Sequence, residues 1–252
     1  MTRRIWITAA CLLAASIPAA AQVAPAPSAI GDLEQRKAAG LRLAQLLYPL
    51  ELQVGVGKNI LRNQFAPTLM KDPNFKAMEA EFPGLLEALV TELEPVFTQW
   101  ITAELPGYHR GIGDFYGSNF ALGELQEIHR FFSTPTGRKI SQGVQMNLKI
   151  DSVMAEAVGN PDAPTTKEAV ESDLATTVAE TLKAIDKSDE PELMRFGSAP
   201  WFPKLKAFRP KLIAFETEFM NRPAPKFEAE ITKIMEKTME KFLAEAQRKA
   251  AA

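Results

Sequence analysis

LLEALVTELEPVFTQWITAEL, residues 85–105, carries the clearest helical pattern in the chain. Its apolar side chains recur at steps of three and four residues, which places them on one broad stripe of an α-helix. These side chains are Leu85, Leu86, Leu89, Val90, Leu93, Val96, Phe97, Trp100, Ile101 and Leu105. Pro95 interrupts the stretch and is expected to kink or split the helix, because proline lacks a backbone N–H.

Helical patterns also flank this stretch on both sides. Asp72-Pro73 predicts a helix start, with a side-chain cap followed by proline at the first helical position. Residues 165–168 (TTKE) match a capping box that opens a helix to about Asp186. A last helix carries apolar side chains along one face from Phe227 to Ala246. Because no alternating apolar and polar run is long enough for a strand, the sequence predicts an all-α helical bundle.

Residues 1–21 have the composition of a secretory signal peptide. Arg3 and Arg4 supply a positive start, an apolar stretch follows, and Ala19-Ala20-Ala21 provides a cleavage site before Gln22. The sequence therefore predicts secretion across the inner membrane and location in the periplasm. Residues 22–31, rich in proline and alanine, are interpreted as a flexible spacer.

Composition excludes several classes of function. The single cysteine, Cys11, lies inside the predicted signal peptide, so the mature chain would have no disulfide and no thiolate site. A formal net charge of −2 gives no electrostatic basis for nucleic-acid binding. No stretch after the signal peptide approaches the roughly 18 apolar residues of a membrane-spanning helix.

Two segments of the chain align when Glu127 is placed opposite Glu192. EIHRFFSTPTGRKI (residues 127–140) and ELMRFGSAPWFPKL (residues 192–205) are identical at six of 14 positions. The pattern predicts a duplicated unit in which a helix ends, Ser or Thr caps the next helix, and proline occupies its first turn. The two copies fall in separate predicted helical regions, residues 32–158 and 165–252.

The first copy resembles a known family. The segment from Gly113 to Ile140, GDFYGSNFALGELQEIHRFFSTPTGRKI, is similar to the core motif of the DUF2059 family, whose members are exported bacterial proteins. The matching positions are Glu124-Leu125, Phe131-Phe132, Ser133, Pro135, Gly137 and Lys139. The resemblance implies an α-helical envelope protein of a Gram-negative bacterium in a family without an established general activity. The second copy departs from the motif at Gly197 and Phe202.

Motifs of known chemistry are missing from the sequence. His109 and His129 are the only histidines, and no His-Glu-x-x-His zinc motif occurs. Gly117-Ser118 and Gly197-Ser198 lack the second glycine of a nucleophile elbow. We therefore predict no cofactor, no metal and no catalytic residue.

The α-helical corner of the first copy offers a candidate interaction or anion site. Free N–H groups at a helix start beside two cations are suited to an anion. The candidate residues are Phe131, Phe132, Ser133, Pro135, Gly137, Arg138 and Lys139. A second hypothesis is an apolar-ligand or peptide groove lined by aromatic side chains. These are Phe115, Tyr116, Phe120, Phe131 and Phe132.

The sequence favours an exported, non-enzymatic envelope protein that acts as an interaction or binding module. Its partner would be another envelope protein or a peptide. One alternative is a periplasmic hydrolase whose active site carries no recognisable motif. Another is a membrane-surface protein that uses the last helix, where Lys233, Lys237 and Lys241 run beside Met235 and Met239. Interleaved glutamates favour a solvated helix face over membrane contact.

Overall fold

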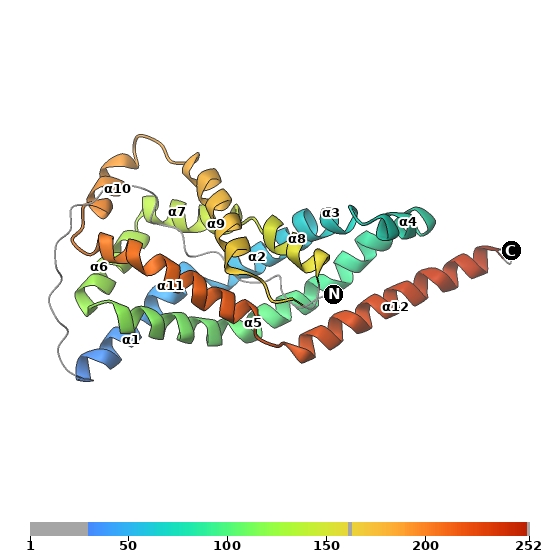
Figure 1. Cartoon of the computed structure of the whole chain (residues 1–252), viewed down its shortest axis with the longest axis horizontal. Helices are drawn as coiled ribbons and strands as arrows, with labels where there is room; N and C mark the ends of the chain where they lie inside the picture. The colour runs from blue at the N-terminus through green and yellow to red at the C-terminus, as the bar shows by residue number, and fades with distance from the viewer. Residues whose placement is uncertain (1–29, 161–162, 251–252) are drawn as a thin grey trace.

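The computed structural model describes residues 30–160 and 163–250, and the described part is helical throughout, without strands (Figure 1). The predicted signal peptide and residues 22–29 of the predicted spacer lie outside the described residues. The helices are α1 (Ile30–Leu47), α2 (Leu50–Ile60), the π-helix η1 (Leu61–Phe65), α3 (Ala66–Leu69), α4 (Pro73–Glu81), α5 (Leu85–Asn119), α6 (Leu122–Phe132), α7 (Pro135–Met146), α8 (Asp151–Gly159), α9 (Lys167–Leu182), α10 (Glu190–Gly197), α11 (Phe202–Met220) and α12 (Pro225–Ala250). The all-α prediction is confirmed.

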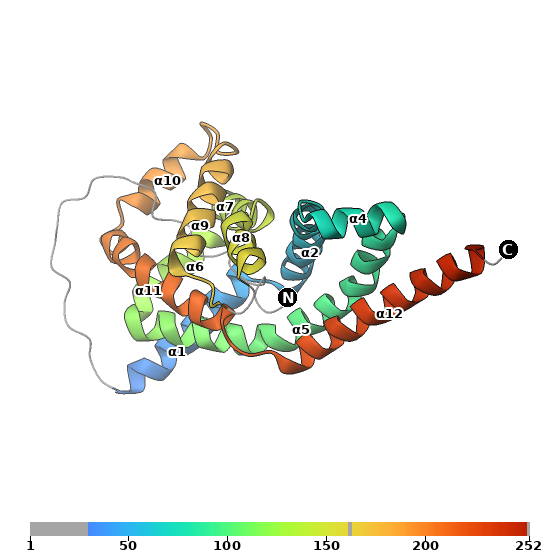
Figure 2. The same ribbon diagram turned by 45° about the vertical axis from the view of Figure 1, so that its right-hand side comes forward.

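The stretch that begins at Leu85 forms the longest described helix, α5, and it continues to Asn119, well past the predicted end at Leu105. Pro95 does not split α5, and neither does Pro106. Both prolines are exposed, so the carbonyls that lose their helical donors can bond to water. Leu93 and Phe97 stay buried on either side of Pro95 and hold the helix in place. Figure 2 shows that α5 bends along its length.

Glycines let α1 and α5 approach unusually closely. A Cβ atom added to Gly40 would lie 2.2 Å from the carbonyl oxygen of Gly113. A Cβ on Gly113 would lie 2.7 Å from the Cα of Leu41, and one on Gly117 would lie 2.6 Å from the Cα of Lys37. Side chains are rarely this close to backbone atoms, so the three glycines determine the α1–α5 distance.

A single hydrophobic cluster joins the helices of both predicted regions. It extends from Ala39 in α1 to Ile231 in α12. Tyr108 and Ile112 of α5 are completely buried within it. The two regions predicted from the sequence, residues 32–158 and 165–252, therefore share one core. Helix α1 begins at Ile30, so it includes the last two residues of the predicted spacer.

The predicted helix starts match the structure closely. Asp72 caps α4 by accepting hydrogen bonds from the backbone N–H of Asn74 at 2.7 Å and of Phe75 at 3.4 Å, and Pro73 is the first helical residue. At α9 the cap is Thr166, the second threonine of the predicted capping box, which accepts from the N–H of Ala169 at 3.2 Å. Helix α9 ends at Leu182, earlier than predicted.

Candidate functional site

The predicted corner site lies between α6 and α7. Ser133 ends α6, and its hydroxyl donates to the carbonyl oxygen of His129 at 2.8 Å. Thr134 caps α7 by accepting from the N–H of Gly137 at 3.1 Å, and Pro135 is the first residue of the helix. The predicted helix–corner–helix geometry is confirmed for this copy, with threonine as the cap.

Gly137 allows the first turn of α7 to rest on the end of α6. A Cβ atom at this position would lie 2.1 Å from the carbonyl oxygen of Phe131. Phe202 holds the equivalent position in the second copy. A phenylalanine would not fit where even a Cβ atom meets the backbone of the preceding helix. Accordingly, Pro200 lies in a turn and α11 begins at Phe202, two residues later than α7 does in the alignment of the two copies. The second corner is therefore two residues longer than the first.

Phe131 and Phe132 are part of the core. They are 7% and 5% exposed, and Phe131 stacks on Phe196 with ring centroids 3.8 Å apart. Phe196 also meets Trp201 edge to face at 5.1 Å. Phe131 and Phe196 occupy equivalent positions in the two aligned segments, so the segments meet through their matching aromatic residues.

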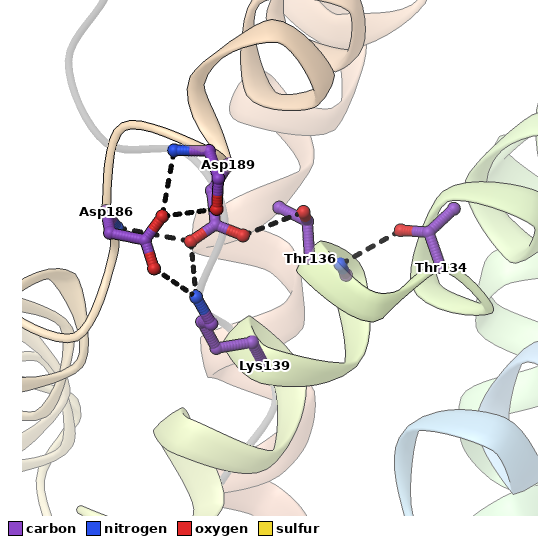
Figure 3. A network of polar contacts seen from close by, with 7 residues as sticks. Thr134, Thr136, Lys139, Asp186 and Asp189 are labelled. Atoms are coloured by element: carbon purple, nitrogen blue, oxygen red, sulfur yellow. Dashed lines mark hydrogen bonds and ion pairs between the residues drawn. The ribbon is translucent and has the colours of Figure 1, made fainter.

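Lys139 is bound by carboxylates of its own chain (Figure 3). Its Nζ lies 2.9 Å from Asp186 and 2.5 Å from Asp189. Thr136 donates its hydroxyl to Asp189 at 2.8 Å, and the backbone N–H of Asp186 donates to the same carboxylate at 3.1 Å. The corner thus holds the loop between α9 and α10.

These contacts shift the pKa of each partner. Hydrogen bonds from Ser188 and then from Lys139 lower the pKa of Asp186 to about 2. The hydrogen bond from Lys139 is the largest cause of the lowered pKa of Asp189. Asp189 in turn is the largest cause of the raised pKa of Lys139. All three groups stay charged at neutral pH, and Lys139 is neutralised locally.

The sequence offers this corner as a candidate anion site, and in the structure the carboxylate of Asp189 in the same chain accepts hydrogen bonds from Thr136 and Lys139. The exposed Arg138 also has a partner within the chain, because it donates to the carbonyl oxygen of Ser133. The seven candidate residues therefore lie together, but their main partners lie within the chain. Charge and packing at this corner favour a structural joint over a ligand site.

A reciprocal pair of contacts connects the two copies. Lys204, which aligns with Lys139, lies 2.6 Å from Glu124. Glu124 in turn aligns with Asp189 when the same alignment is extended. Each copy thus sends its lysine to the acidic residue near the start of the other copy's first helix. Trp201 adds a hydrogen bond from its indole N–H to Glu127.

The prediction of a groove lined by aromatic side chains is wrong, because most of these side chains are buried. Tyr116 and Phe120 are 4% and 1% exposed. Both pack against Phe208, with ring centroids 5.3 Å and 5.0 Å away. Phe115, which is partly buried, stacks on Phe215 at 5.4 Å. These side chains pack into the space between α5 and α11, against Phe208 and Phe215.

An apolar cavity of about 320 Å³ lies at the other end of α5. Three buried leucines on one face of α5, Leu85, Leu89 and Leu93, line it, and we call them the floor. The other lining residues come from η1, α3, α4, α8 and α12 and from the residue that caps α4. They are Phe65, Thr68, Leu69, Asp72, Asn74, Phe75, Met78, Met154, Ala157, Met235, Thr238 and Met239. Figure 2 shows α12 beside the first half of α5.

Hydrocarbon and thioether side chains make up most of the cavity wall. Four methionines contribute, and methionine adapts its shape to what it contacts. Asp72 is the only ionisable residue among the lining residues, and it already caps α4. The site can therefore take up an apolar molecule by excluding it from water, and its few polar side chains are those of Asp72, Asn74 and the threonines Thr68 and Thr238.

Sequence analysis misses this cavity because its parts are far apart in the chain. The sequence pattern assigns Met235 and Met239 to a candidate membrane-contact stripe instead. Periodicity correctly predicts that the leucines of α5 face the core, yet it does not show whether the space opposite them is filled. The one signal in the sequence is the number of methionines on helices that flank the same stripe.

The remaining candidates for chemistry are the histidines and clusters of possible metal ligands. Nε2 of His109 lies 2.8 Å from the carbonyl oxygen of Tyr48, and burial lowers the pKa of its imidazole, so it is neutral at pH 7. Within residues 30–160 and 163–250, no group of three or more His, Cys, Asp or Glu side chains is arranged to hold a metal ion.

Helix length and polarity decide whether a helix can cross a membrane. Among the helices of the described ranges, none combines the length and the apolar character that crossing a bilayer requires.

Comparison with known proteins gives no match. No protein-family model fits the chain, and neither a curated protein nor a solved structure is detectably similar to it. The class of protein is therefore described from its structure alone, as an all-α protein with an apolar pocket.

Proposed function

We propose that this protein is a non-enzymatic binding module of the bacterial envelope, and that its site is the cavity between α5 and α12. The single observation that carries the proposal is the apolar space of about 320 Å³ above Leu85, Leu89 and Leu93. Pockets for small molecules begin at roughly this size and are mostly apolar.

Two features of the sequence support an envelope location. Residues 1–21 have the pattern of a secretory signal peptide, and no cysteine follows them. The resemblance of residues 113–140 to the DUF2059 motif points to the same compartment. An exported carrier of apolar molecules would have a clear use there, since such molecules need shelter from water in the periplasm.

The alternatives have less support. A hydrolase requires an activated nucleophile or an acid–base pair in a cleft, and the cavity lining holds a single ionisable side chain, Asp72, which already caps α4. Membrane binding through the last helix would need its apolar face to be free. In α12, Phe227 and Ile231 are buried against the body of the protein, and Met239 lines the cavity. The apolar residues in the first part of α12 thus already have partners, whereas Leu243 near its end is exposed.

Filling the cavity tests the proposal. Ala157 lies in the cavity wall on α8, so Ala157→Trp places an indole in the space. The matched control is Ala175→Trp on the exposed side of α9. Binding of Nile red, an uncharged apolar dye, is followed by fluorescence. We expect at least a tenfold loss of affinity in Ala157→Trp and none in the control. Equal binding by both variants would refute the cavity as the site.

A further inference from the structure

We infer that the cavity takes a single unbranched aliphatic chain whose polar head is uncharged and carries hydroxyl groups, as in a monoacylglycerol. This inference rests on the proposed function and adds the chemistry of the ligand. It follows from the shape of the floor, from the side chains of the wall, and from the charge of the one polar edge.

The floor extends along the axis of α5. Leu85, Leu89 and Leu93 follow one another at intervals of four residues, so they span about 12 Å along α5. A methylene chain laid along that length would contact all three leucines, and a volume of about 320 Å³ is large enough to admit it.

The wall suits a flexible ligand. Met78 of α4, Met154 of α8 and Met239 of α12 face the same space from three helices. An unbranched thioether side chain can follow an aliphatic chain along its length and change rotamer at little cost. Each methylene group that leaves water adds to the affinity.

Charge at the polar edge selects the head group. No Lys, Arg or His lines the cavity, so an anionic head would have no cation to pair with. Asp72 would repel it as well. Asp72 accepts both of its capping hydrogen bonds through Oδ1. Its Oδ2 accepts none from the part of the chain that the structure describes, and it can accept from a ligand hydroxyl.

Thr68 and Asn74 provide further polar groups at this edge. Both line the cavity together with Asp72. The three side chains can bond to a head with two hydroxyl groups while the aliphatic chain lies over the leucines. An uncharged head avoids the cost of removing an ion from water, which even for an ammonium group beside Asp72 can exceed the Coulombic gain.

Three ligands of equal chain length test the head group. We would titrate monolauroylglycerol, laurate and dodecylammonium into the full-length mature protein at pH 7, each below its critical micelle concentration, by isothermal titration calorimetry. Monolauroylglycerol is expected to bind at least tenfold more tightly than laurate and more tightly than dodecylammonium. Equal or tighter binding of laurate, or tightest binding of dodecylammonium, would overturn the inference.

The variant Asp72→Asn isolates the charge, because asparagine is an equally good helix cap. It should improve the affinity for laurate about tenfold or more and change that for monolauroylglycerol by less than threefold. An unchanged ratio between the two ligands would contradict the role of Asp72.

Nile red separates this inference from the proposed function. If the dye binds in the unmodified protein and is lost in Ala157→Trp, while none of the three aliphatic ligands displaces it, only the ligand class is wrong. If the dye binds Ala157→Trp unchanged, the cavity itself is not the site.

Discussion

Helix α5 presents the same apolar periodicity along its whole length, but its two halves are covered differently. In the second half, Gly113 and Gly117 bring α1 into backbone contact, and Phe208 of α11 fills the space on another side. In the first half, Leu89 and Leu93 face an unfilled space bounded by α4, α8 and α12. We call the second half of α5 the closed half and the first half the open half. The closed half fits a structural role, and the open half is suited to a ligand.

The difference shows why one part of an apolar stripe becomes core and another part becomes pocket. Glycines allow close approach and stacked aromatic rings fill volume, so the second half has no space left. Around the first half, α12 packs chiefly against α5, with Phe227 held between Phe97 at 4.9 Å and Trp100 at 4.7 Å. Methionines next to this anchor leave a space that can change shape.

The largest expected effect is on the stability of the closed half. Phe208→Ala removes a ring that contacts three aromatic side chains at the end of α5, and it should lower the free energy of unfolding by about 4 kcal/mol. Met239→Ala beside the cavity should cost only about 1 kcal/mol, because the methionine is partly exposed and borders an existing space. Urea unfolding measures both. Equal losses of unfolding free energy in the two variants would show that the two halves of α5 are packed equally well.

A second comparison tests the close contact between α1 and α5. Gly113→Ala should lower the free energy of unfolding by about 2 kcal/mol, because its Cβ meets the backbone of Leu41. The control is Gly55→Ala, in the exposed middle of α2, where a Cβ meets nothing within 4 Å. There alanine should stabilise by about 0.5–1 kcal/mol through its higher helix propensity. Stabilisation by both substitutions would contradict the close approach.

The smallest expected effect concerns pH. Asp186 has its pKa lowered from 3.8 to about 2, so the stability it contributes is complete above about pH 4 and is lost as the pH falls through 2. Lys139→Met removes a cause of the lowered pKa of both Asp186 and Asp189. The variant should therefore lose less stability than the unmodified protein between pH 4 and pH 2.

Urea unfolding across this pH range, with Lys76→Met on the exposed side of α4 as the control, would measure the difference. Parallel curves for the Lys139→Met variant and the unmodified protein would show that the corner does not depend on this ion pair. The cavity should be unaffected by either substitution, since neither lysine lines it.

The helical class, most helix starts and the buried face of α5 follow from local sequence patterns alone. Capping by Asp72, proline at the start of α7 and the spacing of the leucines are local effects, so they can be recognised without knowing the fold. The corner residues from Phe131 to Lys139 can also be found together, because they are close neighbours in the chain.

What these elements do depends on contacts between distant parts of the chain. Lys139 meets Asp189 across 50 residues, and Leu89 of α5 shares a cavity with Met239 of the last helix. Neither pairing can be recognised from periodicity, because an apolar or charged side chain has the same local pattern whatever faces it. The cavity exists where helices distant in sequence fail to fill the space between them, and that depends on packing in three dimensions.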